Sequence, residues 1–366
     1  MYIECQKDKL SEFVIRAEKI ANKNASLPIL ACLLLVAKDK NIIGKATNLE
    51  IGVEMSIPAK VNKEGVVAIS ANIFSQAINN LQGGKTVSLE EKNGFLVIKN
   101  DISEIQLKTQ SPQDFPLIPK GEDGEVVNFK IKDFVYGLKT VIFSSSLSSI
   151  KPELGSVYVY PENQELVFVA TDSFRLSEKR IVSKQINNFP SILIPQKNCL
   201  ELIRVFDGLN EDANLFFGKN QINISTSTTH FTSRIVDGSF PDYKQIIPKK
   251  GETVIHCLKQ DLFDGLKAIT VVFDKFNQVT FDTKIKEGFI ILSSKNTDVG
   301  EGECKLKIKG EGEDIVISFN QQYIKESFSG FTDDSITLTF GGPHKPLLIE
   351  GGKSSYFRYL VMPMNR

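Results

Sequence analysis

The sequence contains few of the residues on which metal sites and catalytic sites usually depend. Its 366 residues include three histidines, five cysteines and no tryptophan. The histidines, His230, His256 and His344, have no partner at a metal-binding spacing, and the cysteines form no CxxC pair. This spacing argues against a metal site and indicates reduced thiols in a cytosolic protein. We therefore predict no metal and no cofactor.

Long apolar runs and an excess of one charge are also missing. The longest apolar run, LPILACLLLVA at residues 27 to 37, is too short to cross a bilayer and is typical of a buried strand with its approach. The first ten residues lack a basic region followed by an apolar block, so we expect no secretory signal, a cytoplasmic location and no membrane partner. Forty-four basic residues balance forty-four acidic ones, which gives no overall preference for nucleic acid but permits a local basic face.

Enzyme motifs are absent or incomplete. GGKT at residues 83 to 86 resembles the end of a phosphate-binding loop, but Asn79 stands where the motif requires glycine. A turn between a helix and a strand is the better interpretation. No GxSxG motif occurs, and no serine or cysteine nucleophile has a recognisable base. We predict no catalytic residue.

The stretch ATDSFRLS, residues 170 to 177, places an acid, a hydroxyl group, an aromatic ring and a guanidinium close together. Asp172 at the end of a strand is more typical of an Asx turn than of a general base. Arg175 is either a surface ion pair or the rim of a binding pocket. A rival hypothesis is an enzyme that uses Asp172, Arg175 and His344 at a domain junction, and another is a sequence-reading DNA-binding module. No second acid–base partner supports the first rival, and the neutral charge disfavours the second.

Two helical patterns recur three times along the chain, about 125 residues apart. Apolar residues at helical spacing predict helices at residues 69 to 81, 194 to 206 and 319 to 331. Earlier in each unit, a lysine and a polar first turn precede a second pattern, at residues 7 to 20, 132 to 143 and 259 to 273. The matching core positions are Phe74, Ile78 and Leu81, then Cys199, Ile203 and Phe206, then Ile324, Phe328 and Phe331, and in the earlier helices Leu10, Phe134 and Leu262.

Short β-rich runs with turn signals lie between these helices. The predicted fold class is therefore α+β, with three similar domains that each pack two helices on antiparallel sheets. The period is longer than that of stacked solenoid repeats, so each unit is a small domain. Proline-rich segments at residues 115 to 121 and 240 to 251 place the domains at residues 1 to 121, 122 to 249 and 250 to 366.

Four features together resemble the bacterial DNA polymerase sliding clamp, the β subunit of the replicative polymerase. They are the threefold repeat, ATDSFRLS, FPDYKQIIP at residues 240 to 248 and the terminal YLVMPMNR. The resemblance covers the whole chain and implies a homodimeric ring of six domains, whose helices line a hole around double-stranded DNA. It implies a processivity factor without enzymatic activity, which tethers the replicative polymerase, is loaded by a clamp loader and binds other proteins that carry a clamp-binding motif.

The resemblance also implies a hydrophobic peptide-binding cleft between the second and third domains. Aliphatic walls and adaptable methionines suit short peptides with leucine or phenylalanine anchors. By motif position the cleft comprises Leu154, Thr171, Ser173, Phe174, Arg175, Leu176, Pro241, Gln245, Ile246, Tyr323, His344, Pro346, Leu360, Val361, Met362, Pro363, Met364 and Arg366. The family usually has Gly-His or Gly-Tyr where Ser173 and Phe174 stand, and often ends in MPMRL where this chain has Asn365 and Arg366. Peptide preference therefore does not simply carry over.

A ring that slides must attract phosphates without reading bases. Basic side chains on the repeated helices and in nearby loops are the expected DNA-facing residues: Lys19, Lys23, Lys139, Lys151, Lys197, Arg204, Lys267 and Lys275. Lys197 and Arg204 are seven positions apart and share one helix face. Their counterparts are Asn72 and Asn79 in the first unit and Gln322 and Ser329 in the third, so we expect a thinner positive lining.

Ring closure requires two equivalent head-to-tail contacts between the first unit of one chain and the third unit of the other. The expected residues on the first unit are Ile105, Leu107 and Lys108. On the third unit they are Val271, Val272, Asp298, Glu301 and Glu303. Acids facing bases would fix the orientation of the pair.

Overall fold

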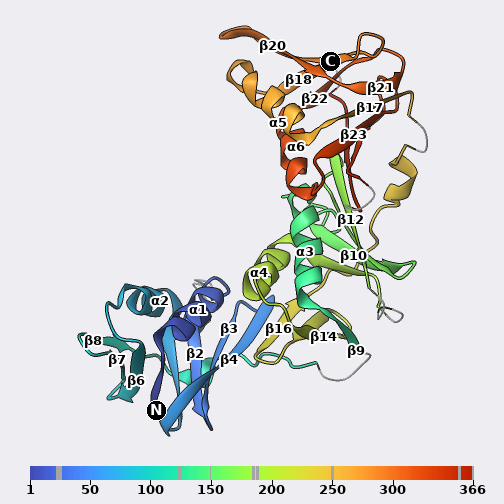
Figure 1. Cartoon of the computed structure of the whole chain (residues 1–366). Coiled ribbons are helices and arrows are strands. Elements are labelled where there is room, and N and C mark those ends of the chain that lie inside the picture. Colours follow the sequence, from blue (N-terminus) through green and yellow to red (C-terminus); the bar gives the residue numbers. More distant parts are fainter. Residues whose placement is uncertain are drawn as a thin grey trace. The chain divides into compact units, whose positions relative to one another are not determined.

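The computed structural model describes residues 1–21, 27–121, 126–148, 150–183, 186, 189–248, 251–352 and 356–364. They form two compact units, one of Met1–Val135 with Lys197–Ile235 and one of Tyr136–Gln196 with Val236–Arg366 (Figure 1). Each unit has its own β-sheets. No helix in the described ranges has the length and apolar character needed to cross a membrane.

One order of elements occurs three times: a strand, a helix, four strands, a second helix and three strands. The first repeat consists of β1 (Tyr2–Gln6), α1 (Lys7–Glu18), β2 (Cys32–Lys38), β3 (Asn41–Thr47), β4 (Ile51–Lys63), β5 (Gly65–Ser70), α2 (Ala71–Asn80), β6 (Thr86–Lys92), β7 (Phe95–Lys99) and β8 (Glu104–Lys108). The second consists of β9 (Val126–Lys130), α3 (Ile131–Val141), β10 (Ser156–Glu162), β11 (Glu165–Thr171), β12 (Arg175–Val182), β13 (Ile192–Pro195), α4 (Gln196–Phe206), β14 (Asp212–Phe217), β15 (Gln221–Ser225) and β16 (Thr229–Arg234).

The third repeat follows the same order with one short extra strand, β21. It consists of β17 (Thr253–Leu258), α5 (Lys259–Ala268), β18 (Gln278–Lys284), β19 (Phe289–Asn296), β20 (Gly300–Lys307), β21 (Lys309–Gly312), β22 (Val316–Asn320), α6 (Gln321–Ser327), β23 (Ser335–Phe340), β24 (Leu347–Glu350) and β25 (Phe357–Val361). Every strand pairing is antiparallel. The α+β prediction with two helices per repeat is confirmed.

The predicted core positions of the helices are buried, because their spacing places them on one helix face. Leu10, Phe134 and Leu262 are buried in the earlier helices. In and just beyond the later helices, all the predicted positions are buried except Ile203, which is half-buried. The predicted buried strand with its approach is also confirmed, as the short 3₁₀ helix Pro28–Ala31 leads into β2.

In the first and third repeats, the lysine that opens the first helix connects it to the end of the second helical segment. Lys7 Nζ donates a hydrogen bond to the carbonyl of Leu81, just after α2. Lys259 Nζ donates in the same way to the carbonyl of Phe331, 2.8 Å away. Leu81 follows α2 directly, and Phe331 follows the 3₁₀ helix Phe328–Gly330 that continues α6. In both repeats the lysine therefore satisfies a backbone carbonyl at a helix end, where carbonyls lack a partner within the helix.

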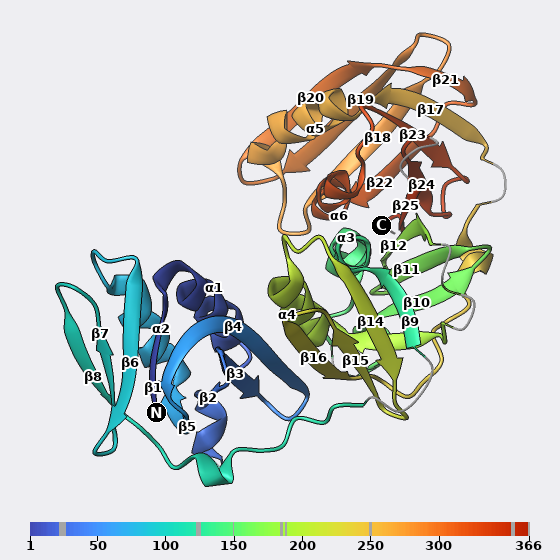
Figure 2. The same cartoon turned by 60° about the horizontal axis from the view of Figure 1, so that its bottom comes forward.

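Two strand pairs, here called seams, join one repeat to the next within a single sheet. In the first unit β4 pairs with β16, so strands of the first repeat continue into strands of the second. In the second unit β12 pairs with β25, and the nine-stranded sheet runs from β13 to β21 through this pair (Figure 2). β4 and β12 are equivalent strands of their repeats, and β16 and β25 are both last strands. A seam therefore always joins the fourth strand of one repeat to the last strand of the next.

Candidate functional site

The stretch at residues 171–175 forms a tight turn between β11 and β12. The Asp172 carboxylate accepts hydrogen bonds from the backbone N–H of Phe174 at 2.9 Å and of Arg175 at 3.0 Å. The Thr171 hydroxyl donates to the carbonyl of Arg175 at 2.6 Å. Ser173 adopts a positive φ of 78°. The interpretation of Asp172 as an Asx-turn residue is confirmed.

Arg175 forms ion pairs, but they are not exposed at the surface, because its side chain is only 11% exposed. Its guanidinium binds the carboxylates of Asp172, at 3.0 Å, and Glu326. It also donates to the carbonyl of Phe143 at 2.7 Å and lies over the Tyr323 ring, 4.4 Å from the centroid. Burial acts against the charge, but the hydrogen bond with Glu326 and the nearby acids outweigh it and raise the pKa of Arg175 above its usual value. The cation is thus fully engaged within the protein.

Apolar side chains are exposed directly beside this turn. Phe174 is 62% exposed and Met362 is 37% exposed. The two residues are held together because the Met362 N–H donates to the Phe174 carbonyl at 2.8 Å. Met364, which is half-buried, is fixed by its own N–H, which donates to the carbonyl of Ser318 at 2.8 Å. The chain after β25 therefore lies alongside the turn.

The other residues expected in the cleft fall into two layers. The accessible ones are Ser173, Pro241, Gln245, Ile246 and His344, which are exposed, and Tyr323, Pro346 and Pro363, which are half-buried. The remaining ones are buried: Leu154, Thr171, Leu176, Leu360 and Val361. Leu176 and Leu360 belong to a core cluster with Tyr160, Tyr243 and Leu348. The five buried residues expected in the cleft are at most 8% exposed, and their place in the cleft stays a prediction. Arg366 lies outside the described residues.

The basic residues expected to face DNA are exposed on or beside helices. This holds for Lys19, Lys139, Lys151, Lys197, Arg204, Lys267 and Lys275. Lys19 lies 3.8 Å from the acidic Glu18, and Arg204 pairs with Glu201. The neutral counterparts are also exposed and bonded: Asn72 with Gln76, Asn79 with Ser11, Gln322 with Glu326 and Ser329 with the Glu326 carbonyl. Lys23 lies outside the described residues.

β8 and β20 occupy the same places in their repeats as the strands that form seams, but neither has a seam partner among the described residues. β8 is a last strand, like β16 and β25, but pairs only with β7. β20 is a fourth strand, like β4 and β12, but pairs only with β19. The expected residues Ile105 and Leu107 lie on the core side of β8, opposite Ile98 and Leu96, yet are only half-buried. One edge of each small core is therefore incompletely covered.

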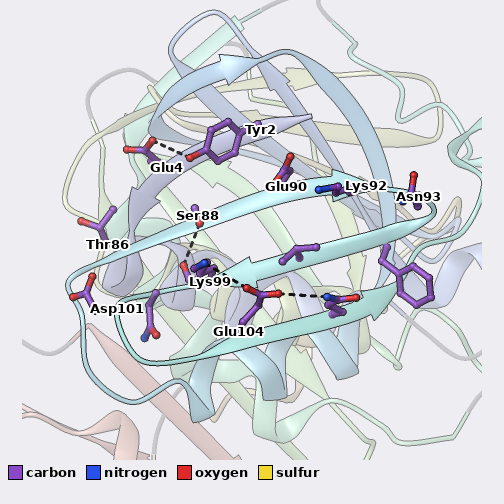
Figure 3. A pocket seen from close by; sticks show the side chains of 14 residues that line it. Tyr2, Glu4, Thr86, Ser88, Glu90, Lys92, Asn93, Lys99, Asp101 and Glu104 are labelled. Carbon is purple, nitrogen blue, oxygen red and sulfur yellow. Dashed lines mark hydrogen bonds and ion pairs between the residues drawn. The ribbon is translucent and has the colours of Figure 1, made fainter.

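The expected charged residues lie along the same two edges. On β8, Lys108 is exposed. Glu104 of the same strand forms an ion pair of 3.5 Å with Lys99, and Figure 3 shows both residues in a hollow of about 900 Å³. On and before β20, Asp298, Glu301 and Glu303 are exposed. Val271 is 77% exposed and Val272 is half-buried.

Sequence reasoning missed several residues of these sites. Cys304 and Leu306 lie on the core side of β20, opposite Leu292 and Ile290, and are half-buried like Ile105 and Leu107. Their alternation with charged residues is a signal for a half-covered strand. Glu326 and Phe143, the partners of Arg175, were also missed. Glu326 is the only acidic residue in the segment 319–331, which marked it as a candidate partner for a basic residue.

A chemical centre for catalysis is not assembled by these residues. His344 is exposed and does not contact the turn at Asp172 in any hydrogen bond of the described residues. No group of three or more His, Cys, Asp or Glu side chains within the described ranges is arranged to hold a metal ion. The arrangement offers exposed apolar side chains on a fixed backbone, which suits binding.

Family models match three consecutive parts of the chain. The N-terminal domain of the DNA polymerase III beta subunit matches residues 1–119, its central domain residues 129–242 and its C-terminal domain residues 244–365. The beta sliding clamp of Staphylococcus aureus is 24% identical over an alignment of 356 residues, and the match covers 94% of this chain and 94% of its own. The solved DNA polymerase III beta subunit of Thermotoga maritima is 26% identical, with a TM-score of 0.93 over 100% of this chain and 99% of its own.

A second solved structure, the sliding clamp of Bacillus subtilis, has a TM-score of 0.91 and 24% identity over 100% of this chain and 99% of its own. The fold and these matches define the class of protein, a DNA sliding clamp that acts as a processivity factor and not as an enzyme. The chain belongs to the DNA polymerase III beta subunit family, whose domain models together match most of its length. The rival interpretation as an enzyme is wrong.

Proposed function

We propose that two copies of this chain close into a ring around double-stranded DNA through pairing of β8 with β20. The observation that carries the proposal is the pattern of strand pairing at the two seams. Both seams within the chain join a fourth strand to the last strand of the next repeat, and β20 and β8 are the one fourth strand and the one last strand that the described chain leaves over. Two identical head-to-tail contacts would close the ring, and each domain would meet the next in the same way.

The side chains of the two edges support this pairing. Ile105 and Leu107 on β8 and Cys304 and Leu306 on β20 are half-buried, so pairing the strands would complete two small cores. Val271 and Val272 lie next to β20, where the Val272 side chain approaches Gly302. Lys108 on one strand and Glu301 and Glu303 on the other carry opposite charges, which favours one orientation. Asp298 adds to the acidic side.

The exposed basic residues on and beside the helices would face the DNA in such a ring. They are Lys19, Lys139, Lys151, Lys197, Arg204, Lys267 and Lys275. Together with the predicted Lys23, they would attract phosphates at long range without contacting base edges. Asn72, Asn79, Gln322 and Ser329 would make the lining less positive than a uniform basic surface. Weak, non-specific attraction suits a ring that must slide.

The surface around Phe174 and Met362 would be the peptide-binding cleft. The exposed members would contact the peptide, and Leu154, Thr171, Leu176, Leu360 and Val361 would form its floor. Through this cleft the ring would tether the replicative polymerase, the clamp loader and other proteins with a clamp-binding motif. A solved relative from Pseudomonas aeruginosa, with a TM-score of 0.93 and 20% identity over 100% of both chains, is bound to griselimycin.

We place the protein in the cytoplasm and keep the domain borders after residues 121 and 249.

Release from linear DNA tests the ring. The protein is loaded onto nicked circular DNA by a clamp loader, and the circle is then cut at one site. We expect complete retention on the intact circle and loss from the cut DNA, because a topological link ends at a free end. Retention on linear DNA at the same salt concentration would contradict the proposal.

The subunit edge is tested by charge reversal. We expect the double variant Glu301→Lys, Glu303→Lys to dissociate at concentrations where the unchanged protein sediments as a dimer, because it places like charges beside Lys108. Glu311→Lys, Glu313→Lys is the matched control, since both residues are exposed but lie outside β20. Equal dimer dissociation constants for the two double variants would remove β20 from the interface.

A further inference from the structure

Arg175 links four separate segments of the second unit. Its guanidinium binds Asp172 in the turn before β12 and the carbonyl of Phe143 in the 3₁₀ helix Ile142–Ser144. On α6 it binds Glu326 and lies over the Tyr323 ring. Through Tyr323 the contact extends to β25, because the Tyr359 hydroxyl donates to the Tyr323 carbonyl at 2.8 Å. Arg175 therefore joins the second repeat to the third on one face of their seam.

The backbone of Arg175 lies at the place where the exposed apolar residues meet. Phe174 directly precedes it, and Arg175 itself is in register with Val361, which directly precedes Met362. The hydrogen bond from the Met362 N–H to the Phe174 carbonyl is the last one between these two segments. Any rotation of the turn away from α6 would break this bond and separate Phe174 from Met362.

From this geometry we infer that Arg175 is a positioning residue of the peptide-binding cleft and not one of its contacts. Its ion pair with Glu326 holds the turn against α6 and so fixes Phe174 beside Met362. A peptide then binds to a preformed surface and does not have to order it, which lowers the cost of binding. The inference rests on the proposed cleft and deepens it, since Glu326 and Phe143 become part of the site although neither is expected to touch a peptide.

Burial and bonding separate this role from direct recognition. The Arg175 side chain is 11% exposed, whereas Phe174, one residue earlier, is 62% exposed. Two carboxylates and a carbonyl already hold the guanidinium, so a peptide carboxylate would compete with Asp172 and Glu326. Glu326 has its own support, because Gln322 donates to its other oxygen at 2.7 Å.

The experiment compares Arg175→Ala, Glu326→Ala and their double variant in the full-length protein. Binding of a fluorescent peptide that carries the clamp-binding motif of the replicative polymerase is measured by anisotropy, well below the unfolding temperature of each variant. We expect each single variant to weaken binding on the order of tenfold and the double variant to add little, because the two residues act through one contact. Arg175→Lys and Glu326→Gln provide milder versions if an alanine variant folds poorly.

Arg180→Ala is the matched control. Arg180 lies on the same strand, is 19% exposed and is held by Glu162, Glu165 and Glu178, but it points to the opposite face of the sheet. It should lower stability by a similar amount and leave peptide affinity unchanged. Hydrogen exchange adds a second readout, since the Met362 amide should lose protection in the Arg175 and Glu326 variants and keep it in Arg180→Ala.

The outcomes are distinct. If Glu326→Ala binds like the unchanged protein while Arg175→Ala does not, Arg175 contacts the peptide itself and the inference is wrong. If Arg180→Ala weakens binding as much as Arg175→Ala, the effect is general destabilisation and the inference is also wrong. Phe174→Ala tests the cleft alone: if it binds the peptide with unchanged affinity, the proposed cleft is misplaced, whatever Arg175 does.

Discussion

The same type of turn occurs twice, at residues 47–51 and at residues 171–175, but the side chains that it presents differ. In the first turn the Asn48 side chain accepts from the N–H of Glu50 and Ile51 at 3.0 and 2.8 Å. The Thr47 hydroxyl donates to the carbonyl of Ile51 at 2.7 Å, as Thr171 does to Arg175. Leu49 has a φ of 75°, against 78° for Ser173. The two turns therefore have the same pattern of hydrogen bonds and the same backbone conformation at their third residue.

The difference lies in the residue that ends each turn and begins the seam strand. Ile51 starts β4 opposite Ser233 and is 2% exposed, whereas Arg175 starts β12 opposite Val361 and binds two acids. The first seam is thus closed by an apolar side chain at this point and the second by a cation. A threonine and a short polar side chain make the turn's hydrogen bonds in both places, whereas the last positions of the turn carry different residues. In the second repeat they carry the exposed Phe174 and the anchored Arg175.

Placing an arginine at the end of the first turn should have the largest effect on stability. Ile51→Arg should lower the free energy of unfolding by about 3–5 kcal/mol, because Ile51 is 2% exposed and the change would bury a charge in a place built for an apolar side chain. Urea unfolding of the purified protein measures the loss. Ile51→Val is the control and should cost only about 1 kcal/mol. A loss below about 1 kcal/mol for Ile51→Arg would show that the first seam accepts a cation as readily as the second.

Removing the side chain that accepts the turn's backbone hydrogen bonds should cost less stability in the first turn than in the second. Asn48→Ala should cost about 1 kcal/mol, the value of a typical cap or turn hydrogen bond. Asp172→Ala should cost about 2–3 kcal/mol, because it also removes a carboxylate partner of the buried Arg175. Thermal unfolding compares the two variants. Asp172→Asn keeps the accepting oxygen and should recover the turn but not the ion pair, and equal losses for both alanine variants would contradict this division.

Local features were predictable from the sequence, and long-range ones were not. The six helices and the Asx role of Asp172 follow from spacing and from neighbours within four positions. The partner of Arg175 does not, because Glu326 lies 151 residues further along the chain. The buried state of Leu176 and Leu360 was missed for a similar reason: a strand covered on both faces has no alternation that marks a surface residue. The alternation of Cys304 and Leu306 with charged residues marks β20 as a half-covered strand, but such a local pattern does not say which strand would cover it.

The first seam contains a buried acid, Glu54, whose ion pairs can be removed by pH. Burial would raise the pKa of Glu54, but hydrogen bonds from Lys45 at 2.8 Å and Lys120 at 3.0 Å lower it below its usual value of 4.5. Because the folded pKa is depressed, the stabilisation is present above pH 4.5 and is lost as the pH falls through the folded pKa.

Glu54→Gln should therefore lower the free energy of unfolding by about 1 kcal/mol at neutral pH, a modest value because Lys120 is largely exposed to solvent. The difference from the unchanged protein should shrink below pH 4.5 and vanish at more acidic pH. Urea unfolding of both proteins across this range tests it. A difference that stays constant with pH would mean that Glu54 contributes through packing and not through its charge.

The smallest effect concerns the positive φ that both turns require. An L-residue in this region costs about 1–2 kcal/mol of strain, while glycine costs about 0.5–1 kcal/mol more than other residues through the entropy of the unfolded chain. Ser173→Gly should thus raise the free energy of unfolding by about 0.5 kcal/mol, and Leu49→Gly should do the same in the first turn unless its side chain adds stability of its own. Ser335→Gly, at the exposed start of β23, is the control and should destabilise, because the backbone there is extended. If Ser173→Gly also destabilises, the serine side chain stabilises the second turn beyond its backbone geometry, and the two turns would differ at their third position as well as at their fifth.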